Sequence, residues 1–164
     1  MNRMTASTET MSAFAHERPP SAVRRLMLRE HSVLRERIAA TRALAAEAAR
    51  DSAVVHRFRA EALRLVAQIE WHLEDEERFV LPLLMESDAW GPERAHRMLE
   101  KHEAQRPGLA KIEALALDGS AADLTDAVQA FGQGLLDVMK GEDAELLCES
   151  VLRDDIVVVD QSDG

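Results

Sequence analysis

The residues in this sequence best suited to chemistry are a histidine and a glutamate four positions apart, His72 and Glu76. Side chains at this spacing project from the same face of a helix. Apolar residues recur around them at alternating steps of three and four, which predicts that this face is buried: Phe58, Ala62, Leu65, Ile69, Phe79 and Leu83. Burying an imidazole and a carboxylate without partners is costly, so we expect a ligand that interacts with both, and a metal ion has that chemistry.

Three other segments also carry polar residues on an apolar helical stripe. His31 interrupts the stripe of a first helix, which we expect to start at an N-cap on Ser21 and to reach about Arg50. His102 interrupts the stripe of a third helix, and Glu142 lies on the stripe of a fourth. Taken alone, a histidine on a buried face is more often a hydrogen-bonded core residue than a metal ligand.

The joint burial of five such residues is what favours a metal site. No lysine or arginine lies on these stripes to pair with the carboxylates, so the cost of desolvating them would be heavy without a shared ligand. A buried hydrogen-bond network without a metal is the alternative that the spacing leaves open. The candidate metal ligands are His31, His72, Glu76, His102 and Glu142.

Prolines mark the limits of the helices that must position these residues. The second helix is expected to follow a cap at Asp51 and Ser52 and to extend towards Met85. Pro82 lacks a backbone N–H and predicts that this helix kinks or ends there. Pro107 likewise predicts a kink in the third helix, one turn after the candidate histidine on that helix.

The whole pattern predicts an all-α fold in one domain. A fourth helix is expected to begin at a Ser120 cap, and four helices joined by short links favour an up-down-up-down bundle over residues 21–152. Residues 1–20 carry no helical periodicity and are predicted to form a flexible tail. Residues 153–164 are predicted to form an acidic tail around an apolar patch at 156–159, which could dock on the bundle or on a partner.

Composition excludes several classes of function. The chain of 164 residues has a formal net charge of -10 and no basic stripe, which argues against a nucleic-acid partner and against an anionic membrane surface. No segment is long and apolar enough to span a membrane, and no signal peptide is recognisable. The single cysteine, Cys148, cannot form an intrachain disulfide, and we expect a cytoplasmic protein.

These residues resemble the hemerythrin-like, or HHE cation-binding, family. The second-helix motif is the most specific match, and the resemblance extends over about residues 22 to 152 through these segments: Glu30-His31, His72-Leu73-Glu74-Asp75-Glu76-Glu77 followed by Phe79 to Pro82, and Glu100-Lys101-His102. The resemblance implies a four-helix bundle that encloses non-haem iron. It favours iron over manganese or zinc, all of which suit mixed imidazole and carboxylate ligands.

The fourth helix departs from the family pattern. Glu142 aligns with Glu76, but Val138 stands where the family has a histidine. The resemblance then implies one of three outcomes: a di-iron site with one position filled by solvent, a single ion held by part of the set, or an empty core that keeps the fold. Glu145 lies one turn further along the stripe and Asp137 beside it, and either could replace the missing ligand.

The functions that follow belong to different classes. A metal-loaded bundle is expected to bind or sense O2, NO, peroxide or iron itself; an enzymatic version would oxidise ferrous iron or reduce peroxide or NO. The alternative is a metal-free helical interaction module with a degenerate site. A protein partner or a homodimer contact is expected at Trp90 or the C-terminal valines. No nucleophile with a neighbouring base and no phosphate loop supports hydrolysis or phosphoryl transfer.

Overall fold

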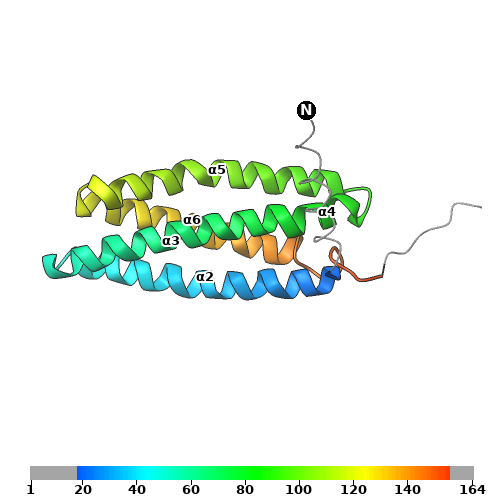
Figure 1. The fold of residues 1–164 in the computed structure, drawn as a ribbon, viewed down its shortest axis with the longest axis horizontal. Helices are drawn as coiled ribbons and strands as arrows, with labels where there is room; N and C mark the ends of the chain where they lie inside the picture. Colours follow the sequence, from blue (N-terminus) through cyan, green and yellow to red (C-terminus); the bar gives the residue numbers. More distant parts are fainter. Residues whose placement is uncertain (1–17, 156–164) are drawn as a thin grey trace, which may run out of the picture.

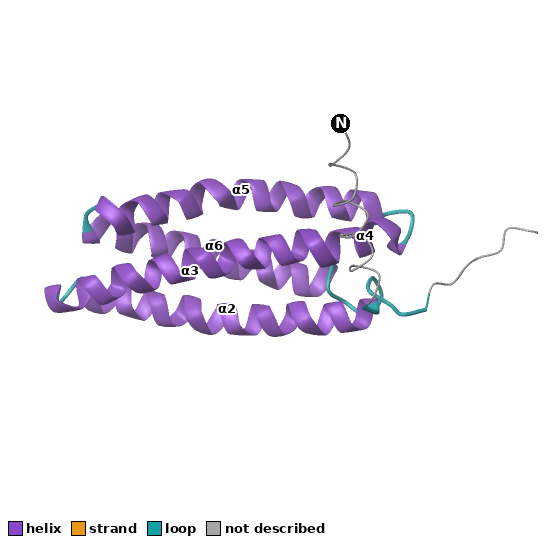
Figure 2. Ribbon diagram, in the orientation of Figure 1, coloured by secondary structure: helices purple, strands orange, loops and turns teal. Residues whose placement is uncertain are grey.

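The computed structural model describes residues 18–155, which form four long helices and three short helical segments (Figure 1). In chain order they are α2 (Pro20–Ala48), η1 (Ser52–Val54), α3 (Val55–Asp75), η2 (Glu76–Val80), α4 (Leu81–Ser87), α5 (Gly91–Asp118) and α6 (Ala121–Glu145). The part of the chain described contains no strand (Figure 2). Successive long helices run in opposite directions (Figure 1), and α2 and α5 each pack against both α3 and α6. The predicted all-α, up-down-up-down bundle is therefore confirmed.

The first helix is not capped as the sequence predicted. Its N-cap is Pro19, which provides no side-chain hydrogen bond, and Ser21 lies inside the first turn. The backbone N–H and the hydroxyl of Ser21 instead donate to the carboxylate of Asp154, at 2.8 and 2.7 Å. The start of the segment predicted as an acidic tail thus lies against the first turn of α2 (Figure 1), where a carboxylate meets the positive end of the helix dipole. The apolar patch at 156–159 and most of the predicted tail at 1–20 lie outside the described residues.

The predicted interruption at Pro82 takes the form of a π turn. The five residues Glu76–Val80 form one π-helical turn between α3 and α4, and the N–H of Leu81 bonds to the carbonyl of Glu76, five residues earlier. Pro82 then stands in the first turn of α4, a position that tolerates a residue without an N–H. The chain stays helical to Ser87 because one inserted residue absorbs the mismatch.

The other two helices differ less from expectation. Pro107 lies inside α5, which continues as a single helix to Asp118. The start of α6 is as predicted, because the hydroxyl of Ser120 accepts a hydrogen bond from the N–H of Asp123 at 3.0 Å. None of the helices that the structure describes combines the length and the apolar character required to cross a bilayer.

Two apolar clusters fill the interior, and a polar layer separates them. One cluster includes Ile38, Phe58 and Leu124 and lies towards the α2–α3 and α5–α6 connections, and the other includes Met27, Leu84 and Leu147 and lies towards α4. Buried polar residues on all four long helices and on the π turn occupy the layer between them: His31, His72, Glu76, His102 and Glu142.

Candidate metal centre

The structure brings the five predicted ligands together in the polar layer. All are almost fully buried, with exposed fractions of 0% for His31, 4% for His72, 2% for Glu76, 1% for His102 and 3% for Glu142. Ionisable side chains are rarely this buried unless they are paired or hold an ion. Their burial confirms that each of the five lies on an inward face of its helix.

Glu76 lies at the middle of this cluster. Its Oε1 is 3.5 Å from Nε2 of both His31 and His72, and its Oε2 is 3.0 Å from Nε2 of His102. Glu76 forms one group of three ligands with His31 and His72 and another with His102 and Glu142. Within each group the three ligand atoms lie within 4.8 Å of one another. Glu76 belongs to both sets, so its two oxygens can serve two positions.

Each imidazole is held on its far side by a second carboxylate. The Nδ1 of His31 lies 2.6 Å from Asp143, that of His72 lies 3.0 Å from Glu30, and that of His102 lies 2.9 Å from Glu77. An ionised carboxylate only accepts hydrogen bonds, so each Nδ1 carries the proton and donates it. With Nδ1 held outward in this way, every Nε2 faces the interior and can bind a metal once it is deprotonated, which is the usual arrangement around ligating histidines. We call Asp143, Glu30 and Glu77 the outer carboxylates.

Arginines hold two of the three outer carboxylates. Arg35 pairs with Asp143, and Nη2 of Arg106 lies 2.8 Å from Glu77. Within residues 18–155, no arginine pairs with Glu30. The orientation of the imidazole that Glu30 holds is therefore the least firmly fixed of the three.

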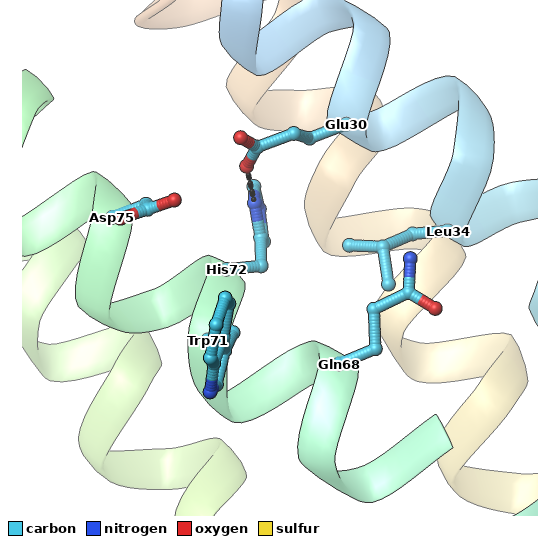
Figure 3. A pocket seen from close by; sticks show the side chains of 6 residues that line it. All are labelled: Glu30, Leu34, Gln68, Trp71, His72 and Asp75. Carbon is cyan, nitrogen blue, oxygen red and sulfur yellow. Dashed lines mark hydrogen bonds and ion pairs between the residues drawn. The ribbon is translucent and has the colours of Figure 1, made fainter. Parts of the chain in front are cut away.

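Glu30 instead borders an open cavity between α2 and α3 (Figure 3). Its carboxylate points to His72 and also faces Asp75, while Trp71 lies at the edge and is 74% exposed. Partial burial and then the negative charge of Glu30 raise the pKa of Asp75. This side of the centre is the one where solvent comes nearest to a predicted histidine ligand.

The outer carboxylates were not predicted from the sequence. On an ideal helix Glu77 is about 100° from Glu76, which puts it off the stripe that the periodicity predicts to be buried. In the structure Glu76 and Glu77 begin the π turn, and both reach the imidazole of His102. A usable signal was present, since each outer carboxylate is adjacent in sequence to a buried polar residue: Glu30-His31, Glu76-Glu77 and Glu142-Asp143.

On α6 the buried stripe differs from the predicted one. The sequence pattern placed Val138 and Glu145 inward, but Val138 is half-buried, Glu145 is exposed, and Met139 is fully buried. Asp137 is exposed and accepts a hydrogen bond from Gln133 at 3.3 Å. A spacing of three and four residues also fits a second set of inward positions on this helix. The residues that are buried in the structure belong to that second set: Leu135, Met139, Glu142 and Leu146. The structure thus brings neither proposed substitute ligand to the centre.

Opposite charges at the centre shift the pKa values of three of the five residues in a connected way. Burial opposes ionisation of Glu76, but hydrogen bonds from His102 and His31 outweigh it and lower the pKa of this carboxyl. Burial also opposes protonation of the two histidines, but hydrogen bonds to Glu76 and to their outer carboxylates outweigh it and raise their pKa values. Without a metal, Glu76 and these two imidazoles therefore each favour the charged form of the other.

Glu142 is the least satisfied member of the cluster. Burial, followed by the nearby charge of Glu76, raises the pKa of Glu142 to about 7. Its Oε1 is buried and has no hydrogen-bond partner. A cation between Glu142 and Glu76 would satisfy this oxygen and replace the protons that the cluster otherwise needs. The mixed imidazole and carboxylate donors fit iron, manganese or zinc.

Comparison with known proteins agrees with this geometry. A family model described as the hemerythrin HHE cation binding domain matches residues 22–149, a range that includes the five clustered residues and all three outer carboxylates. No curated protein and no solved structure matches the chain. Since the family model covers most of the sequence, the chain belongs to the hemerythrin HHE cation-binding domain family.

Proposed function

We propose that this protein binds non-haem iron in the polar layer and uses it to bind or sense O2, NO or peroxide, or to sense iron itself. One observation carries the proposal. Three imidazole Nε2 atoms and two carboxylates face one another between two apolar clusters, while a carboxylate holds the Nδ1 of each imidazole. A hydrogen-bonded core alone does not require all three imidazoles to present the same nitrogen inward.

The two ligand sets favour two ions of unequal affinity. His31, His72 and Glu76 offer two imidazoles and a carboxylate, whereas His102 and Glu142 add one imidazole and one carboxylate around the shared Glu76. We infer a first ion held by the set with two imidazoles and a weaker second ion on the other side. Bound iron would supply a redox-active Lewis acid with positions that protein side chains leave open for a small ligand.

The chain's own residues prepare the site for that chemistry. The outer carboxylates fix the tautomer and orientation of the imidazoles before an ion arrives, which reduces the reorganisation needed on binding. The apolar clusters on both sides of the layer keep bulk water away, and this strengthens electrostatic interactions at the ion.

Metal analysis of protein purified without oxygen tests the proposal directly. We expect between one and two irons per chain and an optical spectrum that changes on exposure to air. Free iron at a hundredfold excess over the dissociation constant should raise the free energy of unfolding by about 2.7 kcal/mol, because only the folded state holds the ligands together. Protein that takes up no metal after reconstitution, and whose thermal midpoint is unchanged by iron, would exclude the proposal.

One observation favours a metal-free interaction module instead. Apart from Oε1 of Glu142, the buried polar atoms of the five clustered residues already have hydrogen-bond partners within the part of the chain described. The core is therefore close to satisfied without an ion, and the bundle could be retained as a scaffold. The same iron titration separates the two functions, since a scaffold gains no stability from iron. Consumption of peroxide or of ferrous iron by the loaded protein would point to the enzymatic version.

A further inference from the structure

Within residues 18–155, two buried side-chain oxygens lack a hydrogen-bond partner, and both lie on α5 and α6. One is Oε1 of Glu142, and the other is Oε1 of Gln105. Gln105 lies on α5 one turn after His102, and only 8% of it is exposed. Both atoms are acceptors, so a cation satisfies them and an anion does not. Buried polar groups in this state call for an explanation, and a missing ligand is one.

The antiparallel packing of α5 and α6 brings these two residues to neighbouring levels of the bundle (Figure 1). A Cβ on Gly141 would lie 4.0 Å from Nζ of Lys101, so these two residues are at about the same level. One turn later on α5, Gln105 lines the same cavity as Val138, which is about one turn earlier on α6. Gln105 therefore faces the turn of α6 that precedes Glu142.

The direction of helical side chains brings the two ends still closer. Each Cα–Cβ bond is tilted towards the N-terminus of its helix, so Gln105 leans back towards His102, and Glu142 leans back towards Val138. Because the helices run in opposite directions, the two side chains lean towards each other. Nε2 of His102 is 3.0 Å from Oε2 of Glu76, so the unpartnered amide lies one turn from a residue of the second ligand set.

The ammonium of Lys101 does not supply the missing partner. Lys101 is half-buried, and its positive charge opposes the rise in the pKa of Glu142 that burial causes. Oε1 of Glu142 and Oε1 of Gln105 nevertheless accept no hydrogen bond from it or from any other group within residues 18–155. Two buried oxygens on this side of the centre therefore remain open to a cation.

We propose that the amide oxygen of Gln105 is a further ligand of the weaker second ion. This inference rests on the proposed function, because it completes one of the two iron positions described there. Gln105 takes the place of the histidine for which this chain has Val138. Carbonyl and carboxylate oxygens suit hard divalent ions, so the amide fits ferrous iron or manganese better than copper. The ligands of the second ion are then Glu76, His102, Gln105 and Glu142.

Anaerobic calorimetric titration of the metal-free full chain with ferrous iron tests the proposal, because it resolves two binding steps of unequal affinity. Gln105→Leu removes the amide oxygen at similar size, so it should weaken the second step about tenfold or more and leave the first within about twofold. Gln105→Glu places a charged oxygen at the same position and should tighten the second step. Gln133→Leu, an exposed change on α6, is the matched control and should alter neither step.

Thermal unfolding gives a second readout that separates a ligand from a structural residue. A buried acceptor without a partner does not stabilise the metal-free fold, so Gln105→Leu should leave the midpoint of the metal-free protein unchanged or raise it. The increment gained on adding iron should fall, because only the folded state binds the ion.

Three results would overturn the proposal. One is a wild-type chain that binds a single iron. Another is a second step that Gln105→Leu leaves unaltered, while the metal-free midpoint falls, which would make the amide a structural group. If Gln105→Leu does not fold, Gln105→Glu decides, and an unaltered second step in that variant is the third. Each of these leaves the first ion in place, whereas a chain that binds no iron at all contradicts the proposed function as well.

Discussion

The α2–α3 wall of the centre differs from the α5–α6 wall. The first contributes the imidazoles of His31 and His72, whose Nε2 atoms are 3.0 Å apart. The second contributes one imidazole, from His102, together with Glu142 and an apolar residue, Met139, at the inward position before it. The comparison teaches that the imidazole groups are concentrated on one wall, while the other wall combines a single imidazole and a carboxylate with apolar packing.

Removing the residue common to both ligand sets should have the largest effect. Glu76→Ala deletes the carboxylate that belongs to both ligand sets, so we expect loss of nearly all bound metal. Metal content after reconstitution measures it. Glu74→Ala, an exposed change two residues earlier at the end of α3, is the matched control and should retain wild-type content. Glu76→Ala with undiminished metal would show that the two ligand sets do not share an ion-binding group.

Adding a histidine to the α5–α6 wall should make the number of imidazoles on the two walls equal. Val138→His places an imidazole four residues before Glu142, the spacing of His72 and Glu76 on the richer wall. We expect metal content to rise towards two ions per chain, measured by metal analysis with an optical spectrum. Met139→His tests the other inward position on α6, because Met139 is the residue that is fully buried in the structure. If metal content rises with Met139→His and not with Val138→His, burial in the structure decides the ligand position, and the spacing of the motif does not.

The difference between these two phases also shows what sequence could predict. Fold class and the five clustered residues followed from periodicity, because a polar residue that interrupts an apolar stripe is visible whatever its neighbours do. The phase of α6 was not determined, since steps of three and four fit Val138 as well as Met139, and packing against the other helices decides between them. The exposure of Glu145 and Asp137 follows from that choice.

The outer carboxylates could not be predicted for a different reason. Their role depends on contacts between helices, such as Asp143 on α6 with His31 on α2, and a pattern along one helix contains no such information. Pro82 did predict an interruption, but not that a π turn would precede it and present Glu76 and Glu77 together to His102. The local sequence thus predicted where the helix is interrupted, but not that the interruption is a π turn.

Substituting the outer carboxylates should have an intermediate effect that again separates the walls. Glu77→Gln and Asp143→Asn remove the charge opposite an imidazole and leave an arginine without its partner, so we expect metal affinity to fall about 10- to 100-fold. Glu30→Gln should cost less, because no arginine within residues 18–155 depends on Glu30 and solvent reaches it. Competition with a chelator measures all three affinities. A larger loss for Glu30→Gln than for the other two would contradict the ranking based on the arginines.

The smallest expected effect is a dependence of stability on pH that has opposite signs with and without metal. In the metal-free protein the pKa of Glu142 is raised from 4.5 to about 7, so the folded state keeps a proton that the unfolded chain releases. This contribution to stability is complete below pH 4.5 and is lost as the pH rises through about 7. The raised pKa values of His31 and His102 act in the same direction above 6.5, whereas the lowered pKa of Glu76 matters only below 4.5.

Metal binding reverses this dependence because the ion needs deprotonated ligands, so its affinity rises over the same pH range. The thermal midpoint of the metal-free protein should therefore fall between pH 5 and pH 8, while the increment gained on adding metal should grow. Scanning calorimetry of both forms across this range measures the two slopes. Glu142→Gln removes one of the groups that titrate in this range and should flatten the metal-free profile without inverting it. Parallel profiles for the loaded and metal-free protein would show that the α5–α6 wall does not exchange protons for a metal ion.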